Sequence, residues 1–121
     1  MAERLKRYAA KLLFQFRVII AGDSGKRRIC EARIILLKAT SGKVALAKAK
    51  QKGRKSQHNY KNSEGNLVRF EFVGVVELLC LDPACDQDEV WYDIVELLLP
   101  SERRARFIPP ESTLNAIRNG D

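Results

Sequence analysis

The sequence lacks the residue sets from which common catalytic centres are built. Histidine occurs once in 121 residues, and no Ser/His/Asp spacing, glycine-rich phosphate loop or HExxH motif is present. The single histidine, His58, has Lys55 and Lys61 as charged neighbours, which is more typical of a solvent-facing residue at a helix end than of a general base. We therefore expect the protein not to be an enzyme, with no catalytic residue and no cofactor.

Cysteine is scarce as well. The chain has three, Cys30, Cys80 and Cys85, and an odd count in a chain of this size argues against a secreted disulfide framework. Together with His58 they make four candidate zinc ligands, but their spacing differs from that of zinc motifs, in which paired ligands stand only a few residues apart. We expect no metal site, with Cys30 and Cys80 as small apolar strand residues and Cys85 in a loop.

Long apolar runs are absent too. No stretch of about 18 apolar residues that could span a membrane occurs, and the charged N-terminus is unlike a signal sequence. These features predict a soluble, cytoplasmic protein with no membrane contact. A length of 121 residues is typical of one domain, for which we expect a core over residues 8–99 and a tail over residues 100–121.

Acidic residues are missing from residues 32–63, where nine lysines and arginines are present. Residues 64–96 show the reverse pattern, with nine acids opposed only by Arg69. The formal net charge of +7 therefore arises from one stretch of the chain. A localised positive field attracts anionic partners, and the acidic stretch forms a second charge pole that can attract cationic ones.

Alternating apolar side chains predict four strands. They occupy residues 8–20, a stretch beginning at Cys30, residues 67–81 and residues 90–99, and the first two are joined by a turn signal over residues 22–25. Helix formers follow the capping sequence at Ser41 and predict one helix over residues 43–55. The expected fold class is α+β, a four-stranded, largely antiparallel sheet in the order strand, strand, helix, strand, strand, with one principal helix packed on a face.

The helix is expected to dock through small residues. Ala45, Leu46, Ala49 and Gly53 form one stripe at 100° per residue, which lets the helix lie close to the sheet. The basic side chains between them then point outward.

The two predicted N-terminal strands are apolar on both faces. We assign Leu12 and Phe14 of the first strand, and Ile34 and Leu36 of the second, to the core face. The opposite face then carries further aliphatic side chains, which indicates that another part of the chain or another copy covers it. These side chains are Leu13, Ile19, Ile35 and Leu37.

Six segments of the sequence together resemble a known family. They are residues 8–14 (YAAKLLF), 31–34 (EARI) with 38–39, 45–46 with 48–49, 60–62 (YKN), Gly65, and 70–75 (FEFVGV). The family that they resemble is the small bacterial family called domain of unknown function 4288. The resemblance covers roughly residues 8–81. It implies a single-domain bacterial protein and supplies no activity, ligand or site residue.

Protein binding is the function that we expect first. A small module without a catalytic set commonly works by binding, either as a regulatory protein or as a homo-oligomer. Ile35, Leu37 and Trp91 are the candidate interface residues, and the two charge poles could steer a partner or a second copy.

Nucleic-acid binding is the alternative that the basic stretch leaves open. Its weakness is that lysine outnumbers arginine and that the aromatic residues are expected in the core, so base readout and stacking have few candidates. A lysine-rich outer face is also typical of an ordinary solvated helix. The candidate contacts are Lys43, Lys48, Lys50, Lys52, Arg54, Lys55 and Lys61.

Overall fold

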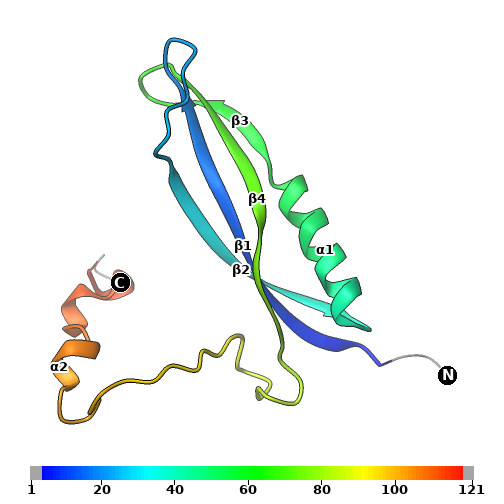
Figure 1. The fold of residues 1–121 in the computed structure, drawn as a ribbon, viewed down its shortest axis with the longest axis vertical. Helices are drawn as coiled ribbons and strands as arrows, with labels where there is room; N and C mark the ends of the chain where they lie inside the picture. Colours follow the sequence, from blue (N-terminus) through cyan, green and yellow to red (C-terminus); the bar gives the residue numbers. More distant parts are fainter. Residues whose placement is uncertain (1–3, 119–121) are drawn as a thin grey trace.

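The computed structural model describes residues 4–118 and shows a curled, four-stranded antiparallel sheet with strand order β2-β1-β4-β3 (Figure 1). One helix, α1, packs on one face of the sheet, and three short helical segments follow near the C-terminus. The predicted antiparallel sheet with a packed helix is therefore confirmed. The elements are β1 (Lys6–Ile19), β2 (Ile29–Ala39), α1 (Gly42–Lys55), β3 (His58–Lys61), β4 (Leu67–Cys80), α2 (Arg104–Phe107), η1 (Glu111–Thr113) and α3 (Asn115–Arg118).

The turn between β1 and β2 has the backbone geometry of a tight β-hairpin. Ala21 and Gly22 both have positive φ, 52° and 81°, and Ile20 and Asp23 exchange two backbone hydrogen bonds of 2.9 and 3.0 Å. Two central residues with φ above zero define a type I′ turn, which matches the twist of the strands. The predicted hairpin is confirmed.

The segment 90–99 is not a strand of the sheet, so that prediction is wrong. It is extended but has no strand partner in the described part of the chain. The fourth strand is β3, which pairs with the beginning of β4 and looks polar in sequence. Turn chemistry explains β3, because Asn62 Oδ1 accepts hydrogen bonds from the backbone N–H groups of Glu64 and Asn66.

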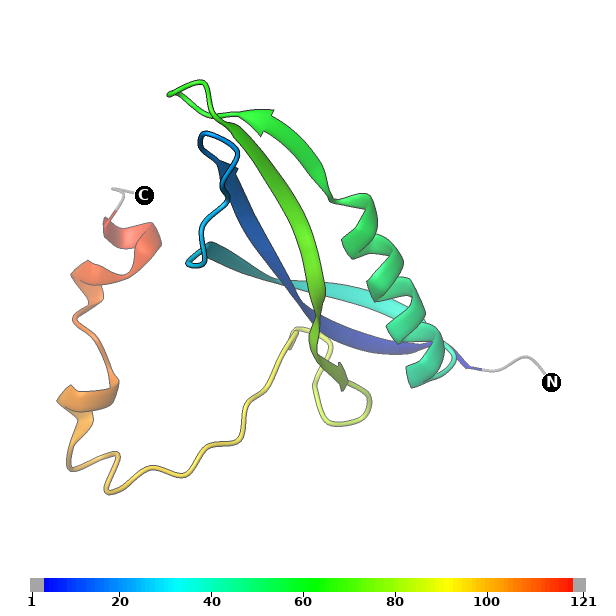
Figure 2. The ribbon, with the colours of Figure 1, turned by 45° about the horizontal axis from the view of Figure 1, so that its top comes forward.

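Helix α1 begins and docks as predicted. Ser41 is the N-cap, and its hydroxyl accepts a hydrogen bond of 3.3 Å from the N–H of Val44. The buried residues of α1 are Ala45, Ala49 and Gly53, which confirms the three small residues of the predicted stripe, whereas Leu46 is only half-buried. Their small size brings the helix close to the sheet, as both ribbon views show (Figures 1 and 2).

Aromatic rings fill the core between the sheet and α1. Phe14 and Phe70 are almost completely buried and stack with ring centroids 4.7 Å apart. The guanidinium of Arg33 lies over both rings, 5.2 and 4.9 Å from their centroids, so a charged side chain covers part of this core by a cation–π contact.

The face assignment of β2 is the second prediction that the structure corrects. Ile35 and Leu37 pack against the helix-side core, whereas Ile34 and Leu36 are 48% and 57% exposed on the opposite, open face. The register decides this, because Tyr8 of β1 stands opposite Leu37 and directly opposed residues share a face. Both faces of β2 carry aliphatic side chains, so the alternation alone could not choose between them.

Candidate interaction surfaces

The basic residues of α1 form two rows rather than one face. Helical geometry places Lys48, Lys52 and Lys55 on one flank of the buried stripe and Lys43, Lys50 and Arg54 on the other, and all six are exposed. Lys61 is also exposed but lies on β3, beyond the C-terminal end of α1. A flat ligand on the outside of α1 would therefore meet the cations of one flank more readily than those of both.

One of these rows lines an open groove beside β2. The groove has a volume of about 450 Å³ and is lined by Leu37 together with Lys48, Lys52 and Lys55. Lys48 Nζ donates a hydrogen bond of 2.8 Å to the carbonyl of Lys38, so this cation of the groove is held against the sheet. Within residues 4–118, the three ion pairs use no cation of α1.

The open face of the sheet divides into a charged half and an apolar half. In the charged half, Arg17 holds Glu71 through two hydrogen bonds of 2.8 and 2.9 Å, and Gln15 donates a third. These contacts, the Arg17 bond first, lower the pKa of the Glu71 carboxyl. Glu71 is thus paired by neighbouring side chains, whereas the buried Nε of Arg69, opposite Arg17, has no hydrogen-bond partner within residues 4–118.

The apolar half is covered by the loop that follows β4. Ala9, Leu81 and Cys85 form a buried cluster there, and Trp91 packs against it. Burial raises the pKa of the Cys85 thiol, which keeps it protonated and unreactive near neutral pH. The Trp91 indole N–H donates a hydrogen bond of 3.0 Å to Asp93. Trp91 is therefore partly buried against its own sheet.

Arg7 holds this loop in place. Its backbone N–H and its Nε donate hydrogen bonds of 3.0 Å to the two carboxylate oxygens of Asp82. The rest of the guanidinium reaches four backbone carbonyls, and the partners are Cys85 at 2.9 Å, Asp86 at 3.2 Å, Gln87 at 3.2 Å and Glu89 at 3.4 Å. The backbone bond from Arg7 is the main cause that lowers the pKa of Asp82. No pattern in the sequence predicts this contact, which joins residues 75 positions apart.

Replacing Arg7 with alanine should free the loop and expose Trp91 at neutral pH. Tryptophan emission reports this, since Trp91 is the only tryptophan, and we expect a red shift while the far-ultraviolet circular dichroism of the sheet is retained. In the wild-type chain the pKa of Asp82 lies below its ordinary value, so the ion pair with Arg7 stays intact at every pH above that lowered pKa. The same red shift should then appear only as the pH falls through the lowered pKa.

Arg106→Ala is the matched control for this variant, because Arg106 is exposed in α2 and makes no contact with the loop. Its emission should equal that of the wild-type chain at every pH. A wild-type spectrum for Arg7→Ala at neutral pH would show that the loop is held by other contacts.

Strand β2 offers a regular, unpaired edge. It pairs with β1 through eleven consecutive residues without a register shift, and its other side has no partner strand within residues 4–118. The exposed edge of β4 is different, because two register shifts interrupt its pairing with β1 and Val73 and Val76 project to solvent. Bulges of this kind protect edges from strand addition, and β2 has none.

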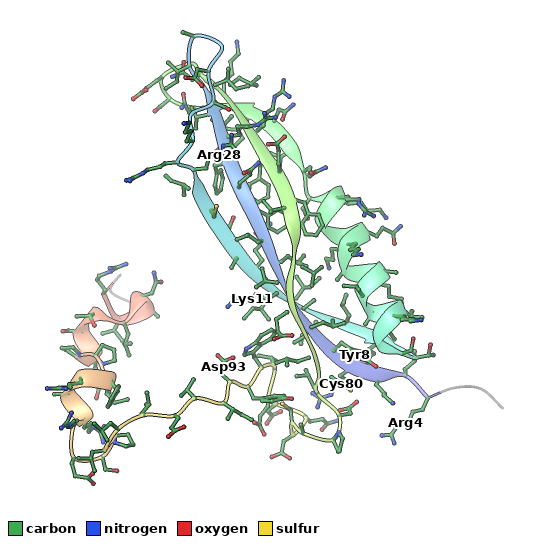
Figure 3. The ribbon with its side chains drawn as sticks, in the orientation of Figure 1. Arg4, Tyr8, Lys11, Arg28, Cys80 and Asp93 are labelled. Atoms are coloured by element: carbon green, nitrogen blue, oxygen red, sulfur yellow. The ribbon has the colours of Figure 1, made fainter. Side chains whose placement is uncertain are left out.

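A long arm leaves the sheet after Trp91. We call residues 93–118 the arm, and both ribbon views show it running away from the sheet (Figures 1 and 2). Asp93 marks its beginning (Figure 3). Its first part is extended and apolar, with Ile94 90% exposed, Val95 72% and Leu98 67%. The sequence predicted an apolar strand here but not that its side chains would face solvent.

Neither a metal cluster nor a membrane helix is found in the part of the chain that the structure describes. Residues 4–118 contain no group of three or more His, Cys, Asp or Glu side chains arranged to hold a metal ion. No helix in the same range is both long enough and apolar enough to cross a membrane.

Comparison with known families identifies the family of the chain. The model of the family described as domain of unknown function (DUF4288) matches residues 7–92. The chain belongs to this family. No curated protein and no solved structure matches it. The part shared with DUF4288 begins at Arg7 and ends at Tyr92, so it contains the sheet, α1 and the loop that Arg7 holds, and the arm lies outside it.

Proposed function

We propose that this DUF4288 protein is a non-enzymatic protein-binding module that associates with copies of itself through the β2 edge and the adjoining open face. The observation that carries the proposal is the unpaired edge of β2 with Ile34 and Leu36 exposed beside it. A long, regular edge strand that no bulge or proline protects readily accepts a further strand, which would displace Lys48 Nζ from the carbonyl of Lys38.

Charge supports association between copies. The edge of β2 carries Arg33 and Lys38, and the basic turn over residues 26–28 precedes it, whereas the beginning of the arm carries Asp93 and Glu96. Opposite charges on two surfaces of one chain let two copies attract each other in a defined orientation. This arrangement favours self-association over binding to a polyanion.

Light scattering across a concentration series tests the proposal. We expect the mass of a dimer or a larger closed oligomer, and Leu36→Asp should weaken the association at least about tenfold, because a buried unpaired carboxylate costs more than about 1.4 kcal/mol. Val73→Asp is the matched control, since Val73 is 55% exposed on a bulge of β4. A monomer at all concentrations, or equal effects of the two variants, would contradict the proposal.

Nucleic-acid binding is a second candidate that one observation favours. Helix α1 carries six cations and no acid, and within residues 4–118 none of them is in an ion pair. Fluorescence polarisation of labelled DNA and RNA should then show binding that collapses between about 50 and 200 mM salt. Charge reversal at Lys48, Lys52 and Lys55 should abolish it without changing the oligomer mass, and absence of binding at low salt would reject this candidate.

A further inference from the structure

The apolar beginning of the arm and the unpaired edge of β2 are complementary in length, conformation, apolar pattern and charge. Residues 93–97 form a five-residue extended segment that ends at the bend of Leu98 and Leu99, and β2 has eleven residues. Most side chains of the segment are apolar and exposed, as are Ile34 and Leu36 at the edge of β2. Both the beginning of the arm and the edge of β2 thus lack a strand partner and carry exposed aliphatic side chains, and pairing with each other would supply the partner and cover those side chains.

From these features we infer that residues 93–97 of one copy add to β2 of a second copy as a fifth, antiparallel strand, and that the second copy returns the same contact. The inference rests on the proposed self-association and names its contact. A reciprocal exchange of this kind closes as a two-fold symmetric dimer, so no edge of β2 stays free to recruit further chains.

One register satisfies both the charges and the apolar side chains. With Asp93 opposite Lys38, Val95 stands opposite Leu36 and Leu97 opposite Ile34 on the open face.

In the same register the other face of the added strand meets the helix side of the sheet. Ile94 stands opposite Leu37, and Glu96 stands opposite Ile35 with Arg33 diagonally beside it. The acids of the arm segment thus meet the cations of β2, and its aliphatic side chains meet those of the edge.

The occupant of the β2 edge is a second copy because the arm of the same chain points elsewhere. Trp91 is packed on the open face of its own sheet, and the chain then continues away from that sheet (Figures 1 and 2). Leu99 has a positive φ of 48°, and the turn that begins there leads into α2, also away from the sheet. A second copy meets residues 93–97 in the conformation observed, whereas the chain's own β2 requires a reversal of the chain after Trp91.

Directed disulfide formation between two distinguishable full-length chains tests the inference. One chain carries Leu36→Cys and the other, labelled with nitrogen-15, carries Val95→Cys, both with Cys30→Ser to remove the exposed thiol of β2. Opposed residues of an antiparallel pair place their Cβ atoms about 4.5–5.5 Å apart, close enough for a disulfide after a small adjustment. We expect a covalent mixed dimer on mild oxidation.

The control replaces Leu36→Cys with Val73→Cys, a cysteine of similar exposure on a different strand, and the mixed dimer should then fall at least about tenfold. A dimer mass by light scattering without preferential crosslinking at position 36 would overturn the arm exchange and leave the proposed self-association standing. A monomer mass would overturn both. A chain carrying both cysteines that closes only within itself would show that the arm folds back on its own sheet.

Hydrogen exchange of the unmodified chain gives a second readout that requires no substitution. At concentrations where the dimer forms, amides of residues 93–97 and the outward amides of β2 should be protected together, and both should lose protection on dilution. Unprotected amides in residues 93–97 of a dimer would overturn the arm exchange.

Discussion

Phe14→Ala should lower the free energy of unfolding by about 3–5 kcal/mol, as expected for removing a fully buried aromatic ring from a packed core. Phe14 has no exposed surface, stacks on Phe70 at 4.7 Å and contacts the Phe72 ring at 5.6 Å. Its removal also takes away one of the two rings beneath Arg33, so the loss includes aromatic and cation–π contacts besides the cavity. Urea unfolding followed by circular dichroism measures the change.

Phe107→Ala is the matched control, because the same ring is removed from a position in α2 that is 38% exposed. We expect its effect to stay within about 0.5 kcal/mol, as for most surface substitutions. Similar losses for the two variants would show that the Phe14 ring is not part of the main core.

Gly53→Leu should destabilise the protein by about 1–3 kcal/mol, the usual cost of inserting side-chain volume into a packed core. A Cβ atom at this position would lie 2.5 Å from two atoms of the Phe72 ring, closer than carbon atoms approach. Helix α1 must then move away from β4, or the Phe72 ring must leave its place. Thermal unfolding gives the loss, and near-ultraviolet circular dichroism should report the displaced ring.

Gly42→Leu provides the comparison for this prediction. Gly42 begins the same helix, and no atom lies within 4 Å of the position that its Cβ would take. Leucine forms helices more readily than glycine does, so this variant should be neutral or slightly stabilising. If Gly53→Leu proved as stable as Gly42→Leu, the close approach of α1 to β4 would be wrong.

Local chemistry made part of the fold predictable from the sequence. The turn after β1 and the cap before α1 depend on a few adjacent residues, and the structure confirms both. The small stripe of α1 could be predicted for the same reason, since helical periodicity places Ala45, Ala49 and Gly53 on one side. These features require no knowledge of distant contacts.

Pairing between distant segments could not be predicted in the same way. Both β3 and residues 90–99 can adopt an extended conformation, and only the turn at Asn62 gives β3 a partner. The two faces of β2 carry similar aliphatic residues, so its core face depends on the register with β1. The wrong strand and the wrong face both follow from this missing long-range information.

The same difference between local and long-range information applies to the candidate surfaces. The basic residues of α1 could be found from charge alone, and their separation into two rows follows from the helical periodicity that also predicts the buried stripe. The contact of Arg7 with the distant loop and the exposure of the arm depend on tertiary structure. Trp91, predicted at an interface, instead packs on its own sheet at the base of the arm.

Native mass spectrometry of a mixture of unlabelled and nitrogen-15-labelled full-length chain tests the central claim most directly. If the protein associates with copies of itself through reversible contacts, the mixture should show unlabelled, labelled and mixed dimers, and Leu36→Asp should reduce all three in favour of monomers. Monomer masses alone, at concentrations where light scattering is also performed, would contradict the proposed self-association.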